Sequence, residues 1–491
     1  MNTFMDNLEK DSNYKLTENG AIAHKSTLSA VYDMFALGGA YRNRSDDDCI
    51  TQFIKALDEN EELAIKCLFY LRDIRGGQGE RRYFRVCFKW LADNRFDIAK
   101  RNLEQVSEFG RWDDLIYSCA DTKLEDDALE IIKHQLALDV TCQTPSLLAK
   151  WLPSENASSK ETKRLGSKVR SYLGVTHKEY RKMLSILRDK IRIVETLMSQ
   201  NRWDEIEFDK IPSRAGMIYR NAFARRDIIA KKYENFVKDD DVKINAKDLY
   251  PYDIAHKAFI AASLPSNSIE RISIQKYWDA LPNFYNKNEE NGLCIVDVSG
   301  SMWGKPLEAA VSLGAYISEH GHGPFANHFI TFSSEPELVA FEGVDITDKF
   351  NRCKSANWGM NTNIEAVFDL LLKVAKEKNT LPEDIPSRLY ILSDMEFDYC
   401  LSTNKFTCTN EGEILTSLES IAKKWESFGY ELPQVIFWNL NARQDTIPAF
   451  GKRFAYISGL SPVIIETILD GKDGYDLMLT KLLSERYNLI K

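Results

Sequence analysis

Apolar side chains recur with a helical period through most of the first half of the chain. Between residues 21 and 237, groups of apolar residues return every three or four positions, which places them on one face of an α-helix. One such group is Leu28, Val31, Tyr32 and Phe35. Further on, Thr176 and Glu179 form a capping-box pattern before another helix. The predicted helices include residues 50–57, 63–71, 83–91, 123–139, 144–152, 180–191 and 212–237.

We predict that residues 21–285 form an α-helical domain, preceded by an N-terminal segment of residues 1–20. Successive helices with short loops and no strand pattern between them are typical of a HEAT-like repeat, or solenoid. A globular all-α bundle is the alternative that this pattern leaves open. The glycine-rich residues 75–79 lack the spacing and the preceding strand of a phosphate-binding loop, so we expect them to turn one helix onto the next.

The pattern changes after about residue 290. Apolar runs of strand length now alternate with helical segments, as in a parallel sheet that helices cover on both faces. We therefore predict an α/β domain over residues 290–491. The predicted strands are 292–296, 325–332, 389–392, 434–439 and 454–457, and the predicted helices include one from Pro306, 361–378 and 413–428.

Oxygen-bearing side chains follow two of these strands. Asp297, Ser299 and Ser301 come directly after the first strand, and Asp394 ends a later one. Thr362 lies at a further junction between a loop and a helix. Ligands of parallel sheets bind at the carboxyl ends of strands, so these side chains are candidates for one site. The alternative is structural, with the hydroxyls capping helices and the carboxylates in turns.

Together, these five residues resemble the metal-ion-dependent adhesion site of von Willebrand A domains, whose Rossmann-like fold also matches the predicted α/β pattern. The resemblance implies that Ser299 and Ser301 bind Mg²⁺, or another divalent cation such as Mn²⁺, directly. It implies a direct or water-mediated role for Thr362 and mostly water-mediated roles for Asp297 and Asp394. Neutral direct ligands leave the ion electrophilic, so it attracts an acidic group from a partner. Metal-dependent hydrolysis would need a base, for which Glu396 is the nearby candidate.

The charge of the chain is distributed unevenly. The 491 residues contain 64 Lys and Arg against 73 Asp and Glu, a net charge of −9, which excludes a uniformly basic nucleic-acid coat protein. Residues 150–232, however, hold 20 basic and 10 acidic residues. The candidate RNA-binding residues within this segment are Lys160, Lys163, Arg164, Lys168, Arg170, Arg181, Lys182, Arg188 and Arg192.

Aromatic residues are interleaved with these cations, as single-stranded RNA recognition requires. Cations neutralise phosphates, while aromatic faces stack unpaired bases. The aromatic candidates are Tyr172, Tyr180, Trp203 and Tyr219. The alternative is a solvated basic helix face with the aromatic residues in the core.

Helical repeats followed by a von Willebrand A domain resemble the Ro autoantigen (TROVE) proteins, whose helices close into a ring and bind small structured RNAs and single-stranded ends. More closely, several motifs are similar to those of an uncharacterised family with the same arrangement, found in plants, fungi, bacteria and viruses. These motifs lie at residues 71–81, 110–115, 151–154, 180–182, 187–188, 202–203 and 212–213.

We therefore expect a non-enzymatic ribonucleoprotein component that binds RNA through its helices and an acidic protein partner through its metal site. The competing hypothesis is a metal-dependent protein-interaction or assembly module without RNA. No small-molecule substrate is expected. The acidic N-terminus lacks a signal-peptide pattern, and no stretch of about 18 apolar residues occurs, so we expect a cytoplasmic protein without membrane contact.

Overall fold

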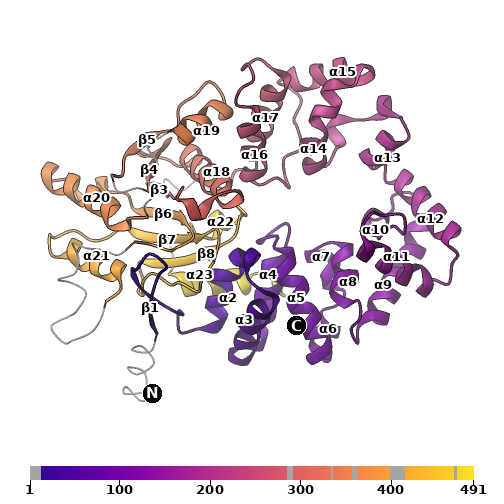
Figure 1. Ribbon diagram of the computed structural model, residues 1–491, viewed down its shortest axis with the longest axis horizontal. Helices are drawn as coiled ribbons and strands as arrows, with labels where there is room; N and C mark the ends of the chain where they lie inside the picture. The colour runs from indigo at the N-terminus through magenta and orange to yellow at the C-terminus, as the bar shows by residue number, and fades with distance from the viewer. Residues whose placement is uncertain (1–12, 285–290, 333–334, 356–361, 399–414, 469–472) are drawn as a thin grey trace.

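The structure is a computed structural model that describes residues 13–284, 291–332, 335–355, 362–398, 415–468 and 473–491 (Figure 1). A helical region comes first along the chain, and a six-stranded α/β region follows it. The predicted order of a helical part and an α/β part is therefore confirmed.

The helical region consists mainly of short and medium-length helices. They are α2 (Ala30–Leu37), α3 (Asp46–Glu59), α4 (Glu61–Arg72), α5 (Arg81–Asn94), α6 (Phe96–Arg101), α7 (Gln105–Phe109), α8 (Trp112–Cys119), α9 (Glu125–Thr141), α10 (Leu148–Trp151), α11 (Lys160–Tyr172), α12 (His177–Lys190), α13 (Val194–Ser199), α14 (Ser213–Arg225), α15 (Asp227–Lys238), α16 (Pro251–Ala261) and α17 (Ile269–Asp279). The 3₁₀ turns η1 (Gly38–Asn43), η2 (Trp203–Glu205) and η3 (Phe208–Lys210) lie between them.

Local signals in the sequence fix several helix ends. The capping box of Thr176 and Glu179 begins α12, as predicted. The single helix predicted over 212–237 is wrong, because Arg226 adopts an extended backbone and separates α14 from α15. The apolar pattern hides this break because Phe223 before it and Ile229 after it are buried in the same cluster.

The helical region has several cores in succession. Residues of α8 to α12 form one apolar cluster, and residues of α13 to α15 with the segment between them form another. The first helices instead share a large core with α16, α17 and the α/β region. Helices therefore pack chiefly against their neighbours along the chain.

The sheet of the α/β region has the order β5-β4-β3-β6-β7-β8. All neighbouring pairs are parallel except β5, which runs antiparallel to β4 at the edge. The sequence did not predict β5 because it has three residues, all of them partly or fully exposed. The strands are β3 (Gly292–Val296), β4 (His328–Thr331), β5 (Leu338–Ala340), β6 (Arg388–Ser393), β7 (Gln434–Asn439) and β8 (Phe454–Ser458).

Helices lie between the strands of this sheet in the sequence and after the last strand. They are α18 (Lys305–His320), α19 (Ile346–Ser355), α20 (Ile364–Lys378), α21 (Ser417–Glu426), α22 (Ile464–Ile468) and α23 (Gly474–Leu482). Short 3₁₀ turns are η4 (Gly300–Met302), η5 (Pro382–Asp384) and η7 (Glu485–Tyr487). The carboxyl end of β3 leads through η4 into α18, which places the predicted metal residues between a strand and a helix.

The helical region contacts the α/β region at both of its ends. Helix α2 packs against β8 and α4 against α23, while α16 packs against α18 and α19. Arg271 of α17 also binds Asp345 and Asp348 next to and within α19. Figure 1 shows the helices leaving the sheet at α2–α4 and returning to it at α16–α17, so the chain forms a closed ring.

A hairpin precedes the helical region and packs on the α/β region. Its strands are β1 (Tyr14–Leu16) and β2 (Ile22–His24). The backbone of His24 pairs with that of Ile447, with N–O distances of 2.8 and 3.0 Å. The helical pattern predicted from residue 21 is therefore wrong for its first residues, and the predicted boundary after residue 20 falls at this hairpin's turn.

Candidate functional site

The predicted metal residues lie at the carboxyl end of the sheet, between its two central strands. Asp297 follows β3 and Asp394 follows β6, and these two strands are parallel neighbours. The next strand along the chain from β3 lies on its other side, so the connections diverge here. Such a point of divergence is where open α/β sheets bind ligands.

Asp297 is buried and held by two donors. Its Oδ1 accepts a hydrogen bond from the backbone N–H of Ser299 at 2.8 Å, and its Oδ2 accepts one from the Ser393 hydroxyl at 2.5 Å. Burial raises the pKa of Asp297, and the nearby charge of Asp394 raises it further. Two neighbouring buried carboxylates repel each other, and a bound cation would remove that cost.

The two predicted serines lie together beside Asp297. Their hydroxyl oxygens are 3.0 Å apart, because η4 turns the chain between them. Trp303, one residue beyond η4 and two positions after Ser301, is 81% exposed. Asp297, Ser299 and Ser301 are thus brought together directly by the strand and the turn that follows it.

Thr362 approaches the same edge from the loop before α20. It is buried, and its hydroxyl lies 3.0 Å from both the backbone carbonyl of Glu396 and Oδ1 of Asp398. The Thr362 oxygen also accepts a hydrogen bond from the side-chain amide of Asn19 at 2.9 Å. Thr362 thus contacts the loop that carries Asp394, and it does so through Glu396 and Asp398.

Asp394 is fully buried and faces an arginine that the sequence did not indicate. Its Oδ1 accepts from the backbone N–H of Glu396 at 3.3 Å. Its Oδ2 lies 3.2 Å from Nη2 of Arg443, a contact between charges that lacks hydrogen-bond geometry. Arg443 also binds Glu18 of the hairpin turn at 2.5 Å. The only signal for Arg443 in the sequence is its place in the loop after β7, at the same edge of the sheet.

The donor atoms of these side chains are of the type that hard divalent cations bind. Over the described ranges, no three His, Cys, Asp or Glu side chains group so as to hold a metal, so a site here depends on hydroxyls as well as carboxylates. Two buried carboxylates and three hydroxyls are oxygen donors of the kind that Mg²⁺ prefers. The Oδ2 atom of Asp394, buried and without a hydrogen-bond donor, has capacity left for a cation or its bound water.

The predicted basic surface is partly neutralised by ion pairs. Arg164 and Lys168 of α11 both bind Asp121, and Arg170 binds Glu155. Arg188 donates to the backbone carbonyls of Ala149 and Leu152 and to the Ser154 hydroxyl, which closes the end of α10. Arg192 lies 3.7 Å from Glu205. Five of the nine predicted cations therefore have structural partners.

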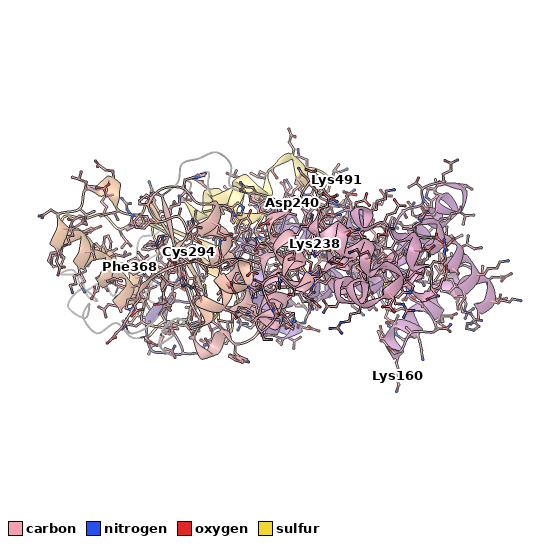
Figure 2. All side chains as sticks on the ribbon, turned by 90° about the horizontal axis from the view of Figure 1, so that it is seen from above. Lys160, Lys238, Asp240, Cys294, Phe368 and Lys491 are labelled. Atoms are coloured by element: carbon pink, nitrogen blue, oxygen red, sulfur yellow. The ribbon has the colours of Figure 1, made fainter. Side chains whose placement is uncertain are left out.

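The other four cations are exposed. Lys160, Lys163, Arg181 and Lys182 have no ion pair within the described part of the chain. Figure 2 shows Lys160, the first residue of α11, projecting beyond the surrounding ribbon. A free cationic surface on α11 and α12 therefore exists, although it is smaller than the sequence indicated.

Two of the aromatic candidates are core residues. Tyr180 is fully buried and Trp203 nearly so, and neither can stack on a base without unfolding its surroundings. Tyr172 is partly exposed, and its hydroxyl donates to Glu130 at 2.9 Å. Tyr219 is also partly exposed. Of the two alternatives, the core assignment is correct for Tyr180 and Trp203.

The glycine-rich motif joins the helical region to the end of the chain. Residues 73–80 turn α4 onto α5, as predicted. Asp73 in this turn is fully buried and binds Arg486 and the Tyr487 hydroxyl of η7. A Cβ at Gly77 would lie 2.1 Å from the carbonyl oxygen of Tyr70, so only glycine fits there.

The neighbouring motif residues form a buried ionic cluster. Asp114, fully buried in α8, accepts from Nε of Arg72 at 2.8 Å and from Nε of Arg85 at 2.6 Å. It also caps its own helix through the backbone N–H of Arg111 at 2.8 Å. The motifs at 71–81 and 110–115 therefore hold neighbouring helices together.

Two family models, both described as domains of unknown function, match parts of the chain. A family model described as "Domain of unknown function (DUF7788)" matches residues 291–482. A second model matches the helical region. Neither model is a Ro or von Willebrand A model, so the resemblances to those two families stay predictions. Within the described residues, no helix combines the length and apolar character that a membrane crossing requires.

One relative extends along nearly the whole chain. "Uncharacterized protein L728" of Acanthamoeba polyphaga mimivirus is 29% identical over 506 residues, which cover 94% of this chain and 86% of the viral protein. The predicted likeness to an uncharacterised family that includes viral members is confirmed to this extent. The model described as "Domain of unknown function (DUF2828)" matches residues 17–118 and 135–282, just over half of the sequence, and the chain therefore belongs to the DUF2828 family.

Proposed function

We propose that the protein is a non-catalytic binding protein whose α/β region is a von Willebrand A-type domain with a site for Mg²⁺ or Mn²⁺. The observation that carries this proposal is the pair of buried carboxylates, Asp297 and Asp394, at the ends of two adjacent parallel strands. The hydroxyls of Ser299 and Ser301 beside them supply neutral oxygens. In the same proposal, the helices are HEAT-like repeats that complete the ring.

The ligand class follows from the chemistry of these donors. Ser299, Ser301 and Thr362 would hold the ion through hydroxyls, with Asp297 and Asp394 behind them. An ion with neutral direct ligands keeps much of its charge and attracts a carboxylate. The partner is therefore an acidic group of another protein, and the exposed Trp303 supplies apolar contact area beside it.

A binding role suits the site better than hydrolysis does. Hydrolysis would require a base close to the bound water, and Glu396 is the nearest further carboxylate. Glu396 is fully buried and already accepts from the backbone N–H of Glu18 at 2.8 Å and from the Thr446 hydroxyl at 2.9 Å. Its carboxylate supports the surrounding loops instead of facing a substrate.

Calorimetric titration with MgCl₂ and MnCl₂ tests the metal site. Wild-type protein should bind one ion, and Asp297→Asn and Ser299→Ala should each abolish binding while the circular dichroism spectrum stays the same. Asp384→Asn, in the exposed turn η5, serves as a control of the same chemical change and should bind like wild type. Retention of binding by Asp297→Asn would overturn the proposal.

RNA binding by the helical region is a second candidate function, favoured by the four exposed cations on α11 and α12. Cations without protein partners are available for phosphates, and their contribution decreases steeply with salt. Binding of single-stranded RNA, followed by fluorescence anisotropy, should weaken with salt and survive EDTA. Reversing Lys163 and Lys182 to Glu should reduce both affinity and salt dependence, whereas Lys452→Glu in the α/β region should not. Equal affinities of these variants would contradict this candidate function.

A further inference from the structure

The turn of the N-terminal hairpin lies directly on the loop that carries Asp394. The Thr17 hydroxyl donates to the carbonyl of Phe397 at 2.6 Å, and the backbone N–H of Glu18 donates to the Glu396 carboxylate at 2.8 Å. Asn19 donates to the Glu396 carbonyl at 2.7 Å. Residues 17–20, named here the cover turn, therefore dock against the edge of the sheet at which the metal residues gather.

Asn19 uses an oxygen that the metal site needs. Its side-chain nitrogen donates to the Thr362 hydroxyl oxygen at 2.9 Å. An amide nitrogen has no free electron pair, so it cannot bind a cation itself. While Asn19 occupies this acceptor position, and the Thr362 proton points to Glu396 or Asp398, that oxygen has less capacity for an ion.

Arg443 links the cover turn to the second buried carboxylate. Its guanidinium contacts Glu18 at 2.5 Å and Asp394 at 3.2 Å, so one cation bridges the turn and the site. A divalent ion held with the help of Asp394 would repel this guanidinium. Displacement of Arg443 from Asp394 would also withdraw the cation that holds Glu18.

The body of the hairpin is fastened independently of the turn. His24 contacts Glu419 at 3.1 Å, and the backbone N–H of Ile22 donates to the Ser417 hydroxyl at 3.2 Å. Gly20 at the end of the turn has φ of +90°, a conformation that glycine adopts without strain. The turn can therefore change its contacts while β2 stays on the α/β region.

We infer that residues 17–20 form a built-in cover that competes with the divalent ion, and with the acidic partner, for the metal site. This inference rests on the proposed metal-binding function. Glu18 pairs with Arg443, which contacts Asp394, and Asn19 donates to Thr362. The ion would use Asp394 and Thr362. Because coupling between two binding events is reciprocal, loss of the docked turn strengthens ion binding, and ion binding loosens the turn.

Calorimetry with MgCl₂ on full-length variants tests the competition. Asn19→Ala removes the hydrogen bonds to Thr362 and to the Glu396 carbonyl, and Glu18→Gln removes the negative charge that pairs with Arg443. Each variant should bind Mg²⁺ about three- to tenfold more tightly than wild type, the range expected for loss of one competing interaction at the site. Leu16→Ala changes an exposed side chain of the same hairpin and should match wild type. In wild type, Mg²⁺ should accelerate amide hydrogen exchange at residues 17–20 but not in β2.

The outcomes separate the two proposals. Unchanged or weaker Mg²⁺ affinity in Asn19→Ala and Glu18→Gln, with binding still abolished by Asp297→Asn, would overturn the cover and leave the metal site intact. Slower exchange of the turn upon Mg²⁺ addition would do the same, since it would show that the turn supports the ion. Absence of Mg²⁺ binding in wild type and in both turn variants would refute the metal site and the cover together.

Discussion

The substitution Asp114→Asn should destabilise the first helices more than the removal of a charge from any exposed side chain in the same region does. The Asp114 carboxylate is fully buried and neutralises Arg72, whose side chain is 2% exposed. Removing one partner of a buried ion pair costs about 3–5 kcal/mol, because the other charge stays buried without compensation. Arg85 loses its contact too, but it is partly exposed and can turn towards water.

Native-state hydrogen exchange at the amides of α4 and α8 measures this cost locally. The exposed pair of Arg75 and Glu108 provides the control, since both side chains are more than half exposed. Glu108→Gln should cost less than about 1 kcal/mol. A double-mutant cycle of Arg72→Met with Asp114→Asn should show a favourable coupling, because the uncompensated charge is then absent. Equal exchange rates in Asp114→Asn and Glu108→Gln would refute a structural role for the buried carboxylate of Asp114.

Two further changes test the same region and its neighbour. Gly77→Ala places a methyl group against the Tyr70 carbonyl oxygen, so it should cost about 1–3 kcal/mol and lower the melting temperature measured by circular dichroism; an unchanged melting temperature would contradict the close approach. Hydrogen bonds from Arg164 and Lys168 lower the pKa of Asp121 to about 2, so its stabilising effect is present above pH 4 and is lost as the pH decreases towards 2. The urea midpoints of wild type and Asp121→Asn should therefore differ modestly at pH 6 and converge as the pH approaches 2, and a constant difference would exclude this ion pair as the cause.

Much of the fold could be predicted because its signals are local. The strand at 434–439 is an apolar run with the bounds that β7 has, and Thr176 begins α12 through a contact three residues away. The hairpin of β1 and β2 could not be predicted in this way. Its strands have three residues each, and the backbone that His24 pairs with belongs to Ile447, far along the chain.

The same distinction applies to the candidate sites. Asp297, Ser299 and Ser301 were found because one strand and one turn place them together. Arg443 and Asn19 were missed because their contacts with Asp394 and Thr362 join separate parts of the chain. Arg188 was predicted to bind RNA for a related reason. Its carbonyl partners lie more than 30 residues earlier, and a basic residue facing them looks like any other basic residue in the sequence.

The contact between Asp73 and Arg486 can form only late in the synthesis of the chain. The two residues are 413 positions apart, and at usual translation rates roughly 20–80 s pass between their appearances. During that interval α4 can fold against α3 and α5, but the buried Asp73 carboxylate lacks its arginine. Nascent protein stalled before Arg486 should therefore remain protease-sensitive around residues 73–80, and ribosome release should abolish that sensitivity.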